Sequence, residues 1–209
     1  MILTHGANSL PRGGEKFVNI GGRDYRYVQI GNQLWMAENL DFAFDGLIVD
    51  PDTFNWRNPL AFHLDRDEAT YGYNGLKLGL YYNYFAKTAL ISALSALNLD
   101  GWKIPSRSDF DTLFANAGAN NEERARNLNA EYPNTVNLSQ KRGADIFGFH
   151  SMFTGYMSIN QDNNTVGWTN VADYAYYNAD APDWNGYCIG KDSIIWYNPC
   201  YTFRLVKNL

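Results

Sequence analysis

The sequence has little of what catalytic and metal sites require. It holds two cysteines, Cys188 and Cys200, whose spacing fits neither a CxxC redox motif nor a zinc motif. Its three histidines, His5, His63 and His150, form no metal-ligand pattern, and no G-x-S-x-G, H-E-x-x-H or phosphate-binding glycine loop is present. We therefore expect no enzyme activity and two reduced thiols, with a disulfide between adjacent strands as the alternative.

Positive charge and long apolar segments are also scarce. Lys and Arg total 17 against 22 Asp and Glu, which gives a net charge of −5, and no basic run occurs. This balance argues against a nucleic-acid or anionic-membrane partner. No segment approaches the roughly 20 apolar residues that span a bilayer, so we expect no membrane insertion. Residues 1–14 show no secretory signal, which predicts a protein made in the cytoplasm.

Apolar and aromatic residues are abundant, and tyrosine stands out. Apolar residues make up 45% of the chain, which is enough for a folded core. Six of the 15 tyrosines lie between Tyr174 and Tyr201, a stretch with a single Lys. Tyr offers a large contact area with few rotatable bonds, so this concentration predicts a recognition surface. The alternative is that these tyrosines line the faces of strands.

The first half of the chain divides into an arm, short strands, an insertion and helices. We expect an N-terminal arm over residues 1–16 and one domain over 17–209. Short runs with turn signals predict antiparallel strands, and the stretch after them reads as an irregular surface insertion. The expected strands are 17–20, 25–30 and 33–36, and the expected insertion is 41–70.

Two helices, and a third shorter one, are predicted in the middle of the chain. Leu90, Leu94 and Leu97 recur at helical spacing in a pattern that starts near Leu80. Ser106 followed by Asp109 predicts a second helix with a capping box, which ends at Gly118. The buried face of this second helix is expected to be Phe110, Leu113, Phe114 and Ala117. The third helix is expected over 122–129. Later strands are expected over 147–149, 152–157, 193–197 and 201–206.

Four stretches of the chain resemble one family, the Fibrobacter succinogenes major paralogous domain. They are 28–40, which contains Trp35-Met36-Ala37-Glu38-Asn39-Leu40, then 79–84, then 101–113 with Gly101-Trp102-Lys103-Ile104-Pro105-Ser106, and finally 201–207. The resemblance covers about residues 17–209. It implies a C-type lectin-like α+β fold in which two helices flank small antiparallel sheets and long loops carry the binding surface.

The same fold is the scaffold of variable proteins of diversity-generating retroelements, including a phage tropism determinant. In these proteins, exposed positions near the C-terminus vary, and this chain carries the corresponding residue types over about 171–202. The resemblance thus implies ligand-binding roles for Tyr174, Tyr176, Tyr177, Asn178, Asp180, Asp183, Asn185, Tyr187, Cys188, Tyr197 and Asn198.

The chain also departs from the family. Leu205 stands where the family usually has a Cys, which argues against an inherited disulfide. The calcium-binding triplet of sugar-binding lectins is replaced by Ala181-Pro182-Asp183, so we expect no cofactor; calcium held by Asp180 and Asp183 is the alternative. The formylglycine-generating enzyme shares the fold, but it needs a closely spaced Cys pair that this chain lacks.

These observations predict a non-enzymatic binding protein. Its expected partner is a protein or glycan on a target cell surface, and its expected assembly is a homo-oligomer such as a trimer. If a phage or prophage encodes it, the expected location is the virion, at a tail or fibre tip; otherwise it is the cytoplasm or the cell surface. The alternatives are a bacterial adhesin or structural module of the same fold and, third, an oxidase like the formylglycine-generating enzyme.

Overall fold

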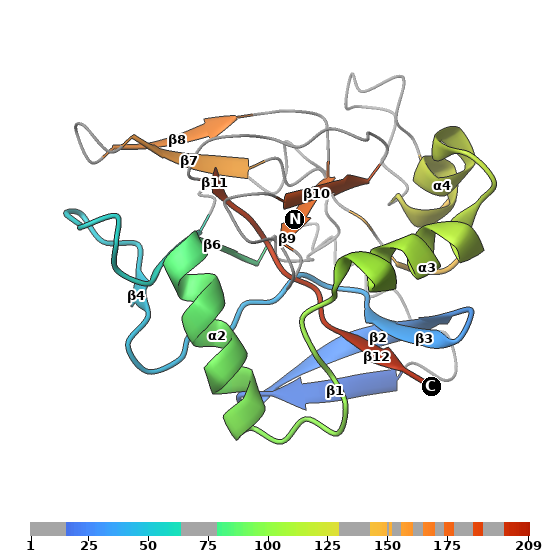
Figure 1. Cartoon of the computed structure of the whole chain (residues 1–209), viewed down its shortest axis with the longest axis horizontal. Helices are drawn as coiled ribbons and strands as arrows, with labels where there is room; N and C mark the ends of the chain where they lie inside the picture. The colour runs from blue at the N-terminus through green and yellow to red at the C-terminus, as the bar shows by residue number, and fades with distance from the viewer. Residues whose placement is uncertain are drawn as a thin grey trace, which may run out of the picture.

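The chain forms an α+β structure of helices and small, curled, mainly antiparallel sheets (Figure 1). A computed structural model describes residues 16–63, 79–129, 143–149, 151, 156–160, 165–169, 174–177, 186–189 and 199–209. Within these residues the order of strands, helices and strands is as predicted, and no helix has the length and apolar character to cross a bilayer. The expected N-terminal arm lies outside the described residues except for Lys16, which begins the first strand.

The first strands form the predicted antiparallel meander. Strand β1 (Lys16–Ile20) pairs with β2 (Arg23–Ile30), and β2 pairs with β3 (Gln33–Met36). Gly21 and the following glycine both adopt positive φ, as a two-residue type I′ hairpin turn requires. The last strand, β12 (Val206–Asn208), adds to β3 and gives the order β1-β2-β3-β12.

One face of this four-stranded sheet carries the main hydrophobic core. Ile20, Tyr25 and Met36 are fully buried and belong to the same cluster as Leu90 of helix α2 (Tyr84–Ala96). Because side chains alternate across a strand, these positions share one side of the sheet. The helix therefore covers that side and stabilises it by removing apolar surface from water.

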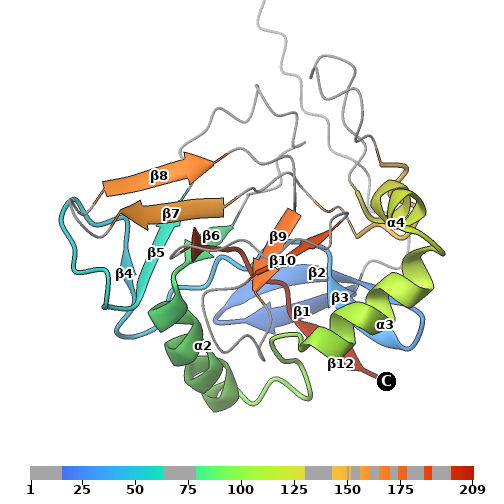
Figure 2. The same cartoon turned by 45° about the horizontal axis from the view of Figure 1, so that its top comes forward.

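The opposite face packs against the second helix, α3 (Arg107–Ala117). The fully buried Trp35 ring lies 5.3 Å from Phe110 of α3 and 6.1 Å from Phe149. Helix α4 (Asn121–Leu128) follows directly and contacts α3, which confirms the short third helix. Figure 2 shows α2 and α3 on different sides of the four-stranded sheet.

The predicted capping box of α3 is confirmed. The Ser106 hydroxyl accepts from the Asp109 backbone N–H at 3.2 Å, and the Asp109 carboxylate accepts from the Ser106 N–H at 2.8 Å. Phe110, Leu113 and Ala117 are buried and Phe114 is half-buried, as a helix with one apolar face requires. Gly118 is the C-cap residue, as predicted.

Helix α2 begins later than the periodicity indicated. Leu80 lies in strand β6 (Leu80–Tyr82), and Asn83 caps the helix by accepting from the Ala86 N–H at 2.8 Å. Leu97, the last residue of the predicted periodicity, is the C-cap residue and is 39% exposed. The error arises because an apolar run fits a buried strand as well as a helix.

The structure corrects the expected irregular insertion over 41–70 in part, and residues 64–70 lie outside the described residues. The segment contributes β4 (Ile48–Val49) and β5 (Leu60–His63), and β5 pairs in parallel with β4 and in antiparallel with β6. Leu60 and Ala61 are fully buried, so β5 belongs to the core, whereas residues 41–59 are exposed or half-buried, as expected of a surface segment. Only tertiary packing reveals such short strands, because their two to four residues carry no periodicity.

The strands predicted in the last third are only partly found. Residues 147–149 form a turn and its exit rather than a strand, and the predicted strand 201–206 is a bridge from Tyr201 to Tyr82 followed by β12. Of the strand predicted over 152–157, only the last two residues are described, and 193–197 lies outside the described residues. The remaining strands are β7 (Tyr156–Asn160), β8 (Thr165–Thr169), β9 (Tyr174–Tyr177), β10 (Gly186–Ile189) and β11 (Pro199–Cys200).

Candidate functional site

Five of the predicted recognition residues lie on two paired strands, β9 (Tyr174–Tyr177) and β10 (Gly186–Ile189). They are Tyr174, Tyr176, Tyr177, Tyr187 and Cys188. These strands form a two-stranded antiparallel sheet in which Tyr176 is opposite Tyr187 and Tyr174 is opposite Ile189. Residues 178–185 separate β9 from β10 in the sequence. The pairing of the two strands therefore brings tyrosines close together that are up to 13 positions apart in the chain, from Tyr174 to Tyr187. Directly opposed positions on antiparallel strands are about 5 Å apart, close enough to act on one ligand.

The strand register divides the predicted residues between two faces. Alternate residues along a strand share a face, and opposed residues share a face across the pair. Tyr174, Tyr176, Tyr187 and Ile189 therefore occupy one face of the sheet. The other face has Tyr177 opposite Gly186, and Cys188 opposite Ala175.

Ile189 is a position that the sequence reasoning missed. It is not one of the residue types that made the segment stand out, and only the strand register places it beside three tyrosines. The other predicted binding residues lie outside the described residues; they are Asn178, Asp180, Asp183, Asn185, Tyr197 and Asn198.

The β9–β10 pair lies between the three-stranded sheet of β11, β7 and β8 on one side and helix α4 on the other (Figures 1 and 2). Strand β10 contacts α4 directly. Helix α4 is fixed in turn, because Asn120 caps its start at 3.0 Å and Arg124 Nε donates to the Gly118 carbonyl at 3.0 Å. Strand β10, which carries Tyr187, thus lies beside a locally well-anchored helix.

A buried arginine joins the C-terminal segment to the segment after β3. Arg204 is 1% exposed, and its Nε donates to the Asn39 side-chain oxygen at 2.7 Å. Its Nη1 donates to the Phe149 carbonyl, and the guanidinium lies 4.5 Å from the centre of the Phe149 ring. Glu38, the neighbour of Asn39, accepts from the Arg26 backbone N–H at 3.0 Å. These contacts show what Glu38 and Asn39 of the sequence motif do physically.

The C-terminal segment passes through the core as an extended chain. Backbone hydrogen bonds join Tyr201 to Tyr82 in both directions, and the Leu40 N–H donates to the Phe203 carbonyl at 2.8 Å. Leu205, which stands where the resemblance led us to expect a cysteine, is fully buried in the apolar core. An aliphatic side chain packed in the core therefore occupies the position.

Cys200 has the properties of a core residue. It is fully buried and is a free thiol. Burial raises the pKa of the Cys200 thiol far above its usual range, so the nucleophilic thiolate is suppressed. The strands that hold Cys188 and Cys200, β10 and β11, belong to different sheets. Within the described residues, no group of His, Cys, Asp and Glu side chains has the arrangement of a metal site.

The family comparison agrees with the motifs noted in the sequence. The family model of the Fibrobacter succinogenes major domain matches residues 28–185, which is most of the chain. The chain belongs to this family. No curated protein matches the chain, and no solved structure matches it. The matched range includes β9 and ends just before β10, so β10 and the buried Arg204 lie beyond it.

Proposed function

We propose that this Fibrobacter succinogenes major domain is a non-enzymatic binding protein that recognises a protein or glycan on a target cell. The register of β9 and β10 supports the proposal, because it gathers Tyr174, Tyr176 and Tyr187 on one face with Ile189. No charged residue occurs within either strand. A face of this composition suits a neutral, partly apolar ligand surface, where Tyr residues supply most of the binding free energy.

The scaffold supports the same function. Strand pairing restricts the backbone of the tyrosine positions before a ligand arrives, so binding loses less conformational entropy than it would on a free loop. The α+β arrangement of small curled sheets and flanking helices is compatible with the C-type lectin-like fold that we propose for the whole domain. The buried Cys200 weighs against an oxidase that works through a cysteine pair.

We further propose that the chain is a variable protein of a diversity-generating retroelement, displayed on a phage tail or fibre tip as a homo-oligomer such as a trimer. Several copies on one particle would compensate for weak single contacts through multivalency. This origin has a direct genomic test. The DNA near the gene should contain a near-identical copy of its 3′ end that differs at adenines, next to a reverse transcriptase gene. Absence of this copy would contradict diversification but not binding.

The binding face is tested by replacing its three tyrosines together. Labelled wild-type protein is screened against a printed glycan array and a panel of intact bacterial cells, and the Tyr174→Ala/Tyr176→Ala/Tyr187→Ala variant is compared on every hit. We expect the variant to bind at least about 100-fold more weakly, because each tyrosine at the centre of an interface contributes about 2 kcal/mol. The melting temperature should change little.

Phe17→Ala provides a matched control, since Phe17 is an aromatic on β1 that is 53% exposed. It should leave binding unchanged. A large fall in the melting temperature of the triple variant would show that these tyrosines are core residues and would contradict the proposed binding face. Unchanged binding by a stable triple variant would contradict it equally.

A further inference from the structure

Strand β1 lies at one edge of the four-stranded sheet, and within the described part of the chain a strand pairs with it on one side only (Figure 1). Every residue of β1 is opposite a residue of β2, from Lys16 opposite Tyr27 to Ile20 opposite Arg23. The free edge of such a strand presents backbone N–H and C=O groups that can pair with a further strand. Phe17 of β1 is also 53% exposed, so an aromatic ring accompanies these backbone groups.

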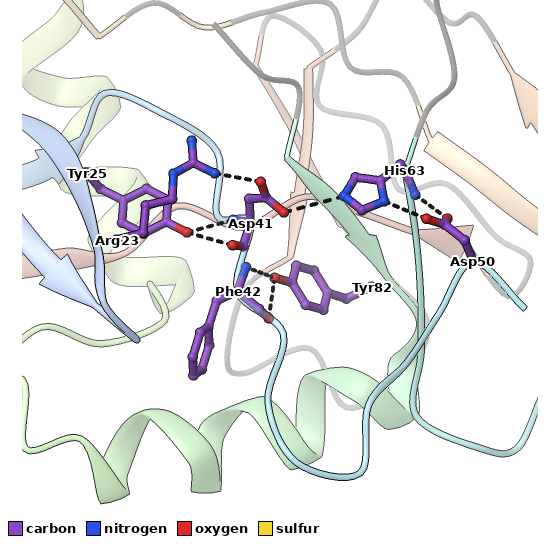
Figure 3. Close-up of polar contacts among 7 residues, drawn as sticks. All are labelled: Arg23, Tyr25, Asp41, Phe42, Asp50, His63 and Tyr82. Carbon is purple, nitrogen blue, oxygen red and sulfur yellow. Dashed lines mark hydrogen bonds and ion pairs between the residues drawn. The ribbon is translucent and has the colours of Figure 1, made fainter.

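The paired side of β1 is firmly anchored. Val18 of β1 is opposite Tyr25 of β2, which is fully buried. The Tyr25 hydroxyl donates to the Asp41 carbonyl at 2.8 Å and accepts from the Asp41 N–H at 3.1 Å (Figure 3). Strand β2 is therefore tied to the segment that follows β3, and it holds β1 in one register. The free edge is thus a rigid template with defined positions.

The turn between β1 and β2 determines which backbone groups of β1 face the free edge. Gly21 and the glycine after it have φ of 60° and 89°, as a two-residue type I′ turn requires. The residues that flank such a turn exchange two hydrogen bonds, and this arrangement recurs at every second pair. Ile20 and the other even-numbered residues of β1 therefore direct their N–H and C=O groups at β2. Phe17 and Asn19 direct theirs at the free edge.

The sequence repeats the same turn signal on the other side of β1. Gly13 and Gly14 precede the strand, so two glycine pairs bracket residues 15–20. A two-residue turn at Gly13 and Gly14 would make residues 15, 17 and 19 its hydrogen-bonded positions. These are the odd-numbered positions, which β2 leaves free. Both turns can therefore be satisfied at once without any backbone group being used twice.

We propose that the free edge of β1 docks residues 8–12 of the same chain as a fifth antiparallel strand, turned back at Gly13 and Gly14. Arg12 and Glu15 then flank the turn as a directly opposed pair of opposite charge, which favours this register. The turn closes the shortest possible loop, so the segment reaches the edge with little loss of chain entropy.

The residues of the docked segment suit the outermost strand of a sheet. Leu10 is opposite Phe17 and on the same face, where it covers the exposed ring. Pro11 follows, and a residue before Pro favours the extended backbone that a strand needs. Pro11 itself is opposite Lys16 at a position whose backbone points away from β1, so its missing N–H costs no hydrogen bond. A proline on the new outer edge also discourages pairing with another molecule.

The docking is tested by amide hydrogen exchange of the full chain, followed residue by residue by NMR. We expect the Phe17 and Asn19 amides to exchange at least about 10-fold more slowly in wild type than in Gly13→Val/Gly14→Val, because Val disfavours the positive φ that the turn needs. The Val18 amide, which bonds to β2, should be equally protected in both proteins and shows that the variant is folded.

Two further variants serve as controls for this comparison. Gly6→Val changes a glycine outside the turn and the docked segment, so it should leave the exchange rates of Phe17 and Asn19 at their wild-type values. Gly13→Asn creates the Asn-Gly pair that type I′ turns favour and should preserve the protection. Fast exchange of Phe17 and Asn19 in wild type, or equal protection in the double Val variant, would overturn the proposal.

A sample that mixes isotope-labelled and unlabelled chains identifies the occupant of the edge. Nuclear Overhauser contacts between the Leu10 methyl groups and the Phe17 ring should arise within one chain. Contacts between Leu10 of one chain and Phe17 of another would mean that a second copy supplies the segment. Contacts between Phe17 and Asn19 of two chains would mean that β1 pairs with itself. Either result would overturn docking within the chain.

Discussion

Two polar networks join distant segments of this chain, and they differ in burial. The Arg204 network is enclosed, with Arg204 and Asn39 each 1% exposed. The His63 network lies at the surface, where His63 Nδ1 is 2.5 Å from Asp50 Oδ2 and its Nε2 is 3.5 Å from Asp41 Oδ1 (Figure 3), and His63 and Asp50 are about half exposed. In both networks a nitrogen-bearing side chain lies against oxygen atoms from other segments, but water can replace the partners of the exposed His63 and cannot reach those of the buried Arg204. Burial therefore makes the first network a fixed structural joint and leaves the second responsive to solvent.

Replacing Arg204 should have the largest effect. Arg204→Met keeps most of the apolar volume but leaves the Asn39 oxygen and the Phe149 carbonyl buried without this donor. We expect a loss of about 2–6 kcal/mol in the free energy of unfolding, measured by urea denaturation, because each such group costs about 1–3 kcal/mol. The exposed Arg57→Met is the control and should change stability by less than about 0.5 kcal/mol. A similar small change in Arg204→Met would show that burial does not distinguish the two networks.

Asp109 occupies an intermediate position in this comparison. Its carboxylate is 4% exposed and lies 2.7 Å from the half-exposed Lys103 ammonium, besides closing the capping box. Burial opposes ionisation, but the hydrogen bonds from Lys103, Ser106 and Asn208 outweigh it and lower the pKa of Asp109. A lowered pKa stabilises the fold above the unfolded-state value of about 3.9 and ceases to do so as pH falls through the folded-state value.

Asp109→Asn should therefore cost about 1–2 kcal/mol at neutral pH, the range for a lost helix cap with its charge. The difference from wild type, measured by urea unfolding, should shrink below about pH 4. Asp111→Asn, an exposed substitution on the same helix, controls for net charge. A difference that stays constant down to acid pH would mean that the charge of Asp109 contributes nothing.

The smallest effect on stability is expected from replacing Asp100, the most exposed of the charged residues compared here. Lys207 Nζ lies 2.7 Å from its carboxylate, and the hydrogen bond and charge of Lys207 lower the pKa of Asp100. The Asp100 side chain is 95% exposed, so water screens the pair. Asp100→Asn preserves the positive φ, which Asn tolerates, and should leave the melting temperature unchanged within error. A clear drop in the melting temperature would show that the exposed Asp100–Lys207 pair stabilises the fold despite its exposure.

Local signals in the sequence predicted the elements that depend on neighbouring residues. Turn glycines and alternating residues identified β1 to β3, and the Ser106–Asp109 spacing identified the start of α3. The same reasoning placed Leu80 in a helix and failed to see β4 and β5, because an apolar run of two to four residues has no period to read. The turn at 147–149 is closed by the local hydrogen bond from the Gly148 N–H to the Asp145 carbonyl, and it also accepts a hydrogen bond at the Gly148 carbonyl from Arg26, far away in the chain.

In the candidate site, too, some features were visible in the sequence and others depended on contacts between distant segments. The concentration of tyrosines was visible in the sequence, but which of them share a face depends on the register of β9 and β10, and that register added Ile189. Nothing in the sequence connected His63 with Asp41 and Asp50, because these residues come from three separate segments. Arg204 and Asn39 were each within noted motifs, yet their pairing across the chain could not be read from either motif.

By itself, the sequence determined the family, the α+β class, the hairpins and helix starts, and the region rich in tyrosine. These properties depend on residue type and on spacing over a few positions, where turn chemistry, caps and periodicity act. Tertiary structure alone decided which segments meet: the buried Arg204 joint, the His63 network and the tyrosine face. Contacts across the chain arise from packing and strand register, whose partners are far apart in sequence, so no local pattern encodes them.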